Sequence, residues 1–363
     1  MSTYMKKIFF LFAALFVIQF SFAQEDSATS KSKFSPSEMI MHHISDAHEI
    51  HFVGDFSIYL PIIIKSEKGW DSFSSSKIYK NPKTLVTASG DELEYFQHED
   101  YVMYHEKIYL AEEGGLLVNE AGKVENKAVS IDLSITKTVV GMFLVVLLML
   151  FLFNPVAKAY KRDGIAAPRG LQSFIEPLVL FVRDEIARPS IGEKADRFTP
   201  FLLSTFFFIW IANVIGLIPF LGGYNITGGI SVTLVLAGIV FIITSVNGNK
   251  HYWKHILWPD GVPFLVKIIV VPIEFAGIFI KPIVLMIRLT ANMTAGHILL
   301  LSFVILIFIF GESSAAAGYG VGVGSVLFMV FMNLLKLLVA FLQAYVFTLL
   351  AALYFGSAVE EAH

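Results

Sequence analysis

The sequence predicts an all-α polytopic membrane protein with about five transmembrane helices, an amphipathic interfacial helix and a small β-rich extracytoplasmic N-terminal domain. Three observations lead to this fold class. Of the 363 residues, 55% are hydrophobic and only 16% are charged, which lies outside the usual range of one soluble domain. The long apolar runs begin after about residue 135. The polar segment before them contains short alternating runs with the two-residue period of strands.

Residues 1–23 have the organisation of a secretory signal peptide. Lys6 and Lys7 precede an apolar core, Ile8 to Phe20, and small residues follow at Ser21 and Ala23. The core is shorter than the ~20 residues that a span requires, which favours cleavage over an uncleaved first membrane helix. In both cases the residues that follow are expected outside the cytoplasm.

Residues 24–134 are expected to form an acidic, β-rich extracytoplasmic domain. Turn-forming residues occur at Ser74–Ser76, Asn81–Pro82 and Gly114–Gly115. Alternating apolar residues predict the strands between them, and these strands are His51–Val53, Phe56–Leu60, Tyr101–Tyr104 and Lys107–Leu110.

Nine of the ten histidines are outside the predicted spans, and four of these nine lie between His42 and His51. Imidazole and carboxylate groups suit zinc, and His48 with His51 has a plausible spacing. Adjacent histidines are nevertheless poorly placed for one tetrahedral centre. We therefore expect a polar surface element, such as a helix start capped by Ser45, with no metal and no cofactor. The chain has no cysteine, so thiolate sites and disulfides are excluded. The net charge of −3, without a basic stripe, predicts no nucleic-acid partner.

The membrane domain is expected at 135–363, with spans at about 135–153, 200–221, 229–246, 271–310 and 325–355. Between the first two spans, apolar residues from Leu171 to Val182 recur at helical spacing and predict the interfacial helix. The same loop is rich in cations, which marks the cytoplasmic side, and these are Lys158, Lys161, Arg162, Arg169, Arg183, Arg188, Lys194 and Arg197. The N-terminal domain is then periplasmic and the C-terminus cytoplasmic in a bacterial inner membrane.

The last two spans are expected to be long and tilted. As one helix, Val271 to Phe310 would rise ~60 Å, about twice the thickness of the hydrocarbon core. It must tilt, bend or project from the bilayer, and Pro282 is a natural place for a bend. A Gly/Ala-rich connector from Gly311 to Gly324 is expected before the last span.

Arg288 lies far from both ends of this long apolar segment. An arginine at mid-membrane costs ~2.5–3.5 kcal/mol on insertion scales, and it cannot lose its proton. The alternative to a functional role is a structural ion pair. At ~100° per residue, Glu274 and Lys281 share the face of Arg288, and Asn292 continues that face. His297 lies on the opposite face.

Polar residues also interrupt the last span, at Asn333, Lys336 and Gln343. Lys336 and Gln343 are seven residues apart and share a helix face. Glu312, at the end of the preceding span, is a candidate partner of Lys336.

Three ordered motifs resemble subunit a of the F-type ATP synthases. Arg288 to His297 reads R-L-T-A-N-M-T-A-G-H and is similar to the family signature R-L-x-x-N-M-x-A-G-H. The resemblance includes Val339 to Phe347 and the stretch from Phe206 to Pro219. It covers roughly residues 135 to 356 and leaves the N-terminal domain outside the common short form.

The resemblance implies a proton-translocating stator subunit beside a rotating ring of c subunits, each with a membrane-embedded carboxylate. Two offset half-channels would serve that carboxylate, and the partners would be the c-ring, the b-subunit peripheral stalk and the rest of the ATP synthase. Arg288 would be the essential arginine facing the ring, supported by Asn292 and Gln343. Glu274 would lie on the cytoplasmic path, and His297 and Asn213 on the outer path. Seven residues before the glutamine the family usually has an acid or a histidine, whereas this chain has Lys336. The outer path is then expected to differ, through Glu312 or water.

Other functions remain open from the residues alone. A sodium-coupled version of the same subunit would need no different motif on this chain. A stand-alone secondary transporter usually shows paired repeats, and we find no convincing repeat. An intramembrane enzyme is disfavoured because H-E-x-x-H, G-x-S-x-G and P-loop motifs are absent. Nucleotide chemistry would then belong to partner subunits.

Overall fold

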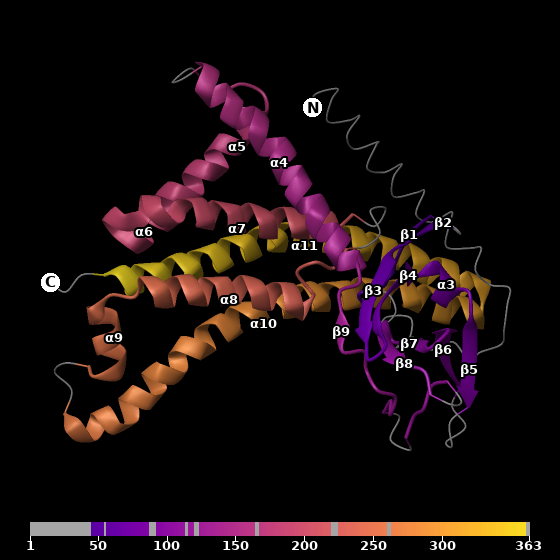
Figure 1. Cartoon of the computed structure of the whole chain (residues 1–363). Coiled ribbons are helices and arrows are strands. Elements are labelled where there is room, and N and C mark those ends of the chain that lie inside the picture. Colours follow the sequence, from indigo (N-terminus) through magenta and orange to yellow (C-terminus); the bar gives the residue numbers. More distant parts are fainter. Residues whose placement is uncertain are drawn as a thin grey trace. The chain divides into compact units, whose positions relative to one another are not determined.

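The computed structural model describes residues 45–53, 56–86, 92–112, 115–119, 123–163, 167–218, 224–259 and 263–360. The predicted signal peptide, His42 and His43 lie outside this part of the chain, and so does the side chain of Glu312. The chain divides into two units after Ser134, with Asp46 grouped with the second unit. Figure 1 shows the elements of both.

The first unit is β-rich, as predicted, and its strands pair antiparallel. Strand β1 (Glu49–Val53) pairs with β2 (Phe56–Tyr59). A three-stranded sheet has the order β4 (Gly69–Ser74), β3 (Pro61–Ser66), β9 (Ile131–Asp132). A four-stranded sheet has the order β5 (Pro82–Val86), β6 (Glu92–His98), β7 (Tyr101–Tyr104), β8 (Lys107–Leu110).

The core of this unit lies on one face of β3. Ile62 and Ile64 are fully buried, whereas Ile63 and Lys65 alternate outward, as the two-residue strand period requires. The short helix α3 (Ser76–Tyr79) contributes Ile78, although a turn was expected at Ser74–Ser76. The buried cluster consists of Ile62, Ile64, Ile78, Tyr101, Met103 and Ile108.

The expectation of a polar surface element near His48 is wrong. Strand β1 begins at Glu49 in place of a helix, and only 2% of His48 is exposed. Its carbonyl accepts hydrogen bonds from the Leu60 N–H (3.0 Å) and the Ser75 hydroxyl (2.8 Å). Its N–H donates to Glu106 Oε2 (3.3 Å). These backbone bonds fix the segment inside the domain. Among the described residues, no three His, Asp or Glu side chains are grouped to hold a metal.

The second unit is helical, and the predicted five spans are confirmed by five helical segments long and apolar enough to cross a membrane. The long helices are α4 (Lys137–Asp163), α7 (Ala195–Gly216), α8 (Ile230–Asn247), α10 (Phe264–Ser313) and α11 (Ala315–Val359). In Figure 1, α7, α11 and α8 run side by side, and α10 begins apart from them at the lower left and approaches them obliquely. Helix α10 packs along α8 and α11, and α11 also packs on α7.

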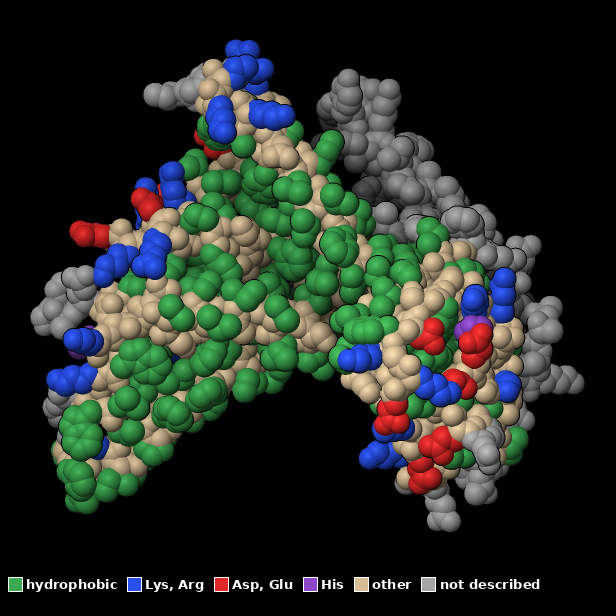
Figure 2. Space-filling view, in the orientation of Figure 1, with side chains coloured by type: hydrophobic (Ala, Val, Ile, Leu, Met, Phe, Trp, Pro, Cys, Tyr) green, Lys and Arg blue, Asp and Glu red, His purple; other side chains and the backbone are tan. Residues whose placement is uncertain are grey.

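Shorter helices connect these spans. The predicted interfacial helix appears as α5 (Leu171–Leu180), which continues into a π-helical segment, Phe181–Ala187. The short helix α6 (Arg188–Ile191) and a 3₁₀ turn (Gly192–Lys194) lead into α7. Helix α9 (Lys250–Leu257) follows α8. Figure 2 shows lysine and arginine gathered at the ends of this unit and hydrophobic side chains along the long helices.

Three helices, α4, α10 and α11, are longer than the apolar segments that predicted them. Helix α4 continues past Asn154-Pro155, where the first span was expected to end. Helix α10 remains continuous through Pro272 and Pro282 over 50 residues. Hydropathy marks only the part that crosses hydrocarbon, whereas a helix can extend into the polar layers on each side.

The expected Gly/Ala-rich connector is wrong, because only Ser314 separates α10 from α11. The two helices approach closely at this end. A Cβ atom on Gly318 would lie 2.8 Å from the Cα of Gly311. Small residues permit such backbone contact between membrane helices, so the glycines serve helix packing rather than a loop.

Candidate functional site

Arg288 lies on an exposed, apolar face of α10. Val284 and Ile287 beside it are also exposed, as are Leu338 and Leu342 on α11. Among the described residues, no acidic side chain forms an ion pair with Arg288. Its charge is therefore not neutralised by a carboxylate from the described part of this chain.

One turn beyond Arg288, an amide pair joins α10 to α11. Asn292 Nδ2 donates a hydrogen bond of 3.2 Å to Gln343 Oε1. Asn292 is exposed, whereas Gln343 is only 8% exposed. Asn292 is four residues from Arg288, so the two side chains share one helix face. The pair thus fixes the facing positions of α10 and α11 beside the cation.

A second polar group lies toward the start of α10. The Lys281 ammonium lies 5.6 Å from the centroid of the Tyr354 ring on α11, a distance at which a cation is attracted to an aromatic face. Glu274 is half-buried two turns earlier on α10, about 21 Å of helical rise before Arg288. A small cleft beside this group is lined by Val240, Phe241, Thr244, Tyr252, Ile278, Lys281, Pro282, Tyr354 and Ser357.

Asn213 on α7 belongs to a third polar group, on the other side of Arg288 along α10. Its side chain is buried, and Nδ2 donates to the Ala340 carbonyl of α11 at 3.5 Å. Its Oδ1 accepts a hydrogen bond from the Thr227 hydroxyl. Both polar atoms of the amide are therefore satisfied, as burial requires.

His297 faces the end of α7. A Cβ atom on Gly216 would lie 2.6 Å from Met293 Cε and 3.9 Å from His297 Nε2. His297 Nε2 is buried and has no hydrogen-bond partner in the described structure. A buried polar atom of this kind needs a partner such as water or an ion.

Lys336 of α11 lies across Gly296 of α10. A Cβ atom on Gly296 would approach Lys336 Cε to 2.8 Å and Nζ to 3.4 Å. The ammonium is buried without a hydrogen-bond partner, and it is close enough to His297 to interact electrostatically. Gly296 therefore provides the space that the lysine side chain occupies.

The structure brings the sequence-predicted residues together in part. Asn292 is hydrogen-bonded to Gln343, and Lys336 lies against Gly296, the neighbour of His297 in sequence, whereas Glu274 lies about 21 Å of helical rise before Arg288. Sequence reasoning missed the supporting contacts of Thr227, Gly216 and Gly296. It also missed a hydrogen bond of 2.6 Å between the hydroxyls of Thr233 on α8 and Thr290 on α10. Thr290 and Gly296 lie inside the Arg288–His297 motif, and this position in the motif was the sequence feature that could have indicated their contacts.

The arrangement can stabilise a negative charge that approaches from outside the chain. Arg288 presents a permanent cation on an apolar surface, and separate polar groups lie before and after it along α10. A carboxylate on a neighbouring apolar surface is favoured in its ionised form beside such a cation.

Two protein-family models match parts of this chain. Residues 139–356 match the family model described as ATP synthase A chain. Residues 39–133 match a second model, described as a domain of unknown function (DUF8433).

Curated relatives share the membrane domain. ATP synthase subunit a of Chloroherpeton thalassium is 42% identical over 244 residues, which cover 64% of this chain and 70% of the relative. The subunit of Pelodictyon phaeoclathratiforme is 42% identical over 240 residues, with 64% and 68% covered. ATP synthase subunit a 2 of Prosthecochloris aestuarii is 38% identical over 274 residues, with 73% and 81% covered.

The family model covers more than half of the chain, and it contains Arg288 together with all three polar groups around it. The resemblance that the motifs predicted is therefore confirmed: the chain belongs to the ATP synthase subunit a family, as a multi-pass membrane component of the ATP synthase.

Proposed function

We propose that this chain conducts protons through two offset half-channels beside a rotating ring of c subunits, and so couples proton flow to ATP synthesis. Arg288 carries this proposal. It is a permanent cation on an exposed apolar helix face, without an acidic partner among the described residues. Such a cation favours the ionised form of each ring carboxylate that passes it.

Arg288 also separates the two half-channels. A proton that moved directly from one half-channel to the other would have to pass a fixed positive charge, which opposes it. The Asn292–Gln343 hydrogen bond supports this role because it holds α10 against α11 beside the cation. We assign Asn292 and Gln343 the positioning of this face.

Two of the three polar groups, one on each side of Arg288 along α10, are assigned to the two half-channels. Glu274, near Lys281 and the small cleft, serves the cytoplasmic path. Asn213, His297 and Lys336 serve the outer path. Charged Lys336 offers only hydrogen-bond donors, so a water molecule between it and His297 would carry the proton. The unpartnered nitrogen atoms of both residues support this assignment.

We further propose that the chain lies in a bacterial inner membrane, with a periplasmic N-terminal domain and a cytoplasmic C-terminus. The lysines and arginines near α6 and α9 support this orientation. The c-ring and the b-subunit peripheral stalk are the proposed direct partners. The nucleotide reaction belongs to other subunits of the complex.

Replacement of Arg288 tests the mechanism. Arg288→Ala is expected to assemble into the complex and to abolish proton-driven ATP synthesis in membrane vesicles. The matched control is Arg169→Ala, because Arg169 is an exposed arginine outside α4 and α5, and it should keep normal synthesis. Near-normal coupled synthesis by an assembled Arg288→Ala complex would refute the proposal.

The coupling ion is tested separately in the unaltered complex. Proton coupling predicts ATP synthesis that a protonophore abolishes and that needs no added sodium. Synthesis that depends on a sodium gradient and survives the protonophore would instead establish the sodium-coupled alternative.

A further inference from the structure

The sheet β4-β3-β9 in the first unit has one face that the core does not cover. Strand pairing places Lys65 of β3 opposite Trp70 of β4 on one side and opposite Ile131 of β9 on the other. Side chains two residues apart share a face, so Ile63 and Leu133 belong to the same face. We call these five residues, Ile63, Lys65, Trp70, Ile131 and Leu133, the Trp70 face.

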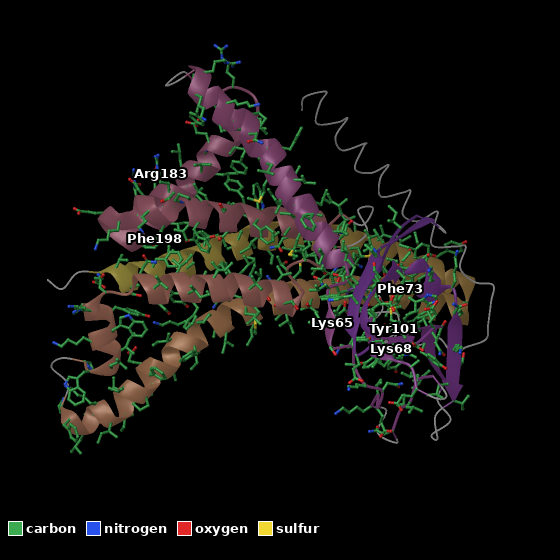
Figure 3. All side chains as sticks on the ribbon, in the orientation of Figure 1. Lys65, Lys68, Phe73, Tyr101, Arg183 and Phe198 are labelled. Carbon is green, nitrogen blue, oxygen red and sulfur yellow. The ribbon has the colours of Figure 1, made fainter. Side chains whose placement is uncertain are left out.

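The Trp70 face is strongly exposed. Trp70 is 58% exposed, Ile131 43% and Leu133 59%. The Lys65 ammonium lies 5.7 Å from the centroid of the Trp70 ring. Figure 3 shows Lys65 on one side of the sheet, with Phe73 and Tyr101 on the other. The opposite face carries Ile62 and Ile64 into the core.

Charge is also divided between the two faces. The carboxylates of these strands are Asp71 and Asp132, and both pair with Ile64. They therefore lie on the same face of the sheet as the buried Ile64, where Asp71 accepts a hydrogen bond of 3.1 Å from the Tyr101 hydroxyl. The Trp70 face combines apolar side chains with one cation and has no carboxylate from these strands.

The chain connects this face directly to the first membrane helix. The Leu133 N–H donates to the Ile63 carbonyl (2.9 Å), and the Ile63 N–H donates to Ser134 Oγ (3.1 Å). Helix α4 begins at Lys137, so only two residues follow the last sheet hydrogen bond. The three Cα–Cα steps from Ser134 to Lys137 span at most ~11 Å. Ser134, which is hydrogen-bonded to β3, therefore lies within that distance of the start of α4.

We propose that the Trp70 face lies on the phospholipid bilayer, with Trp70, Ile131 and Leu133 at the headgroup level and Lys65 toward the lipid phosphates. Tryptophan is enriched at membrane–water interfaces. A lysine can place its methylene groups along apolar surface while its ammonium stays in the polar layer. An exposed patch of large apolar side chains needs such a covering, and the short connection to α4 makes the bilayer the nearest apolar phase.

Site-directed spin labelling tests this contact in the assembled ATP synthase reconstituted in phospholipid vesicles. The chain has no cysteine, so Trp70→Cys and Leu133→Cys each accept one nitroxide on this chain. The matched control is Val86→Cys on β5, because Val86 is an apolar residue of the other sheet with a similar exposure, 65%. Collision with oxygen, with a water-soluble nickel chelate and with a nickel-chelating lipid is measured for each label by power saturation.

The proposal predicts a higher ratio of oxygen to nickel-chelate collisions at Trp70→Cys and Leu133→Cys than at Val86→Cys. The nickel-chelating lipid should relax the first two labels and not the third. Equal water accessibility at all three positions would overturn the proposal. The proposal would also be overturned if oxygen and the water-soluble nickel chelate were both excluded from the Trp70→Cys and Leu133→Cys labels to the same extent in detergent and in vesicles. That result would indicate that a protein partner covers the face. The labelled complexes must retain ATP synthesis, which shows that they are assembled.

Discussion

Asn292 on α10 and Gln343 on α11 are joined by a 3.2 Å hydrogen bond although 51 residues separate them in sequence. Arg288 lies one turn from this bond. The position of the cation relative to α11 therefore depends on a contact between two uncharged side chains.

Loss of this amide contact should impair coupling without removing it. Gln343→Leu removes the acceptor, and interhelical hydrogen bonds in membranes contribute ~1 kcal/mol. We expect assembled complexes with coupled ATP synthesis reduced several-fold, and Gln343→Glu should retain more activity because it keeps an acceptor oxygen. If Gln343→Leu matched the unaltered complex in ATP synthesis, the bond would not position the arginine.

Gly296 and Lys336 are expected to be energetically coupled. A Cβ atom on Gly296 would lie 2.8 Å from Lys336 Cε, near the flexible end of the lysine side chain. Gly296→Ala should therefore displace that side chain and lower the thermal stability slightly. Lys336→Ala removes the obstructing side chain. The double variant should therefore be closer to the unaltered protein in thermal stability than Gly296→Ala alone. A double-mutant cycle measures the interaction, and strictly additive effects would contradict the contact.

Gly356 should tolerate no side chain. A Cβ atom there would overlap the Ser190 carbonyl oxygen of α6, a backbone atom that cannot rotate away. Gly238 on α8 provides the control, because a Cβ atom there meets nothing within 4 Å. Gly356→Ala should lower the yield and melting temperature of the assembled complex. Gly238→Ala should leave both unchanged or raise them, because alanine is favoured over glycine in helices by ~1 kcal/mol. Equal behaviour of the two variants would refute the packing of α11 on α6.

Glu106 predicts a dependence of domain stability on pH. Burial raises the pKa of this carboxyl group, but hydrogen bonds from His48 and Tyr79 outweigh burial and hold it below its usual range. The Tyr79 hydroxyl donates to Glu106 Oε2 at 2.6 Å. Because the pKa is lower in the folded state, the carboxylate stabilises the fold above the unfolded value of ~4.3. That stabilisation is lost as the pH falls through the folded pKa.

Proteolysis of the N-terminal unit as a function of pH checks this prediction. At pH 7, Glu106→Gln should be cleaved faster than the unaltered protein, because it loses charge-assisted hydrogen bonds. The difference should shrink once the pH falls well below ~4.3. Glu94→Gln, an exposed carboxylate on β6, should not differ from the unaltered protein at pH 7. A constant difference for Glu106→Gln at every pH would show that charge is not its cause.

Periodicity predicted much of the fold, and its failures have physical causes. The runs at β7 and β8 were predicted as strands, although three successive residues of β7 are buried. In β3, Ile62, Ile63 and Ile64 are all apolar and conceal the alternation of their burial. Ile63 points outward on the Trp70 face and is half-buried, so an apolar residue on the outer face hid the two-residue period of this strand. Strand β9 has only two residues, which is too short for a periodic pattern.

The candidate site was predictable along each helix but not between helices. A period of 3.6 residues places Arg288 and Asn292 on one face and His297 on the opposite one. Which residue of α11 each one meets depends on the turn between α10 and α11. That turn is the single residue Ser314 and not the expected connector. The contact of Gly296 with Lys336 follows from this register and could not be read from the sequence.

Pro282 has one further consequence for α10. Proline has no backbone N–H, so the carbonyl group of Ile278 loses the donor that an uninterrupted helix would supply. A carbonyl oxygen without a donor is costly in hydrocarbon and is tolerated where protein or water can reach it. Ile278 lines the same small cleft as Lys281, Thr244 and Ser357. The gap in the hydrogen-bond ladder and the cleft thus occur at one height of the helix. On the proposed cytoplasmic path, this backbone oxygen would be an acceptor for water.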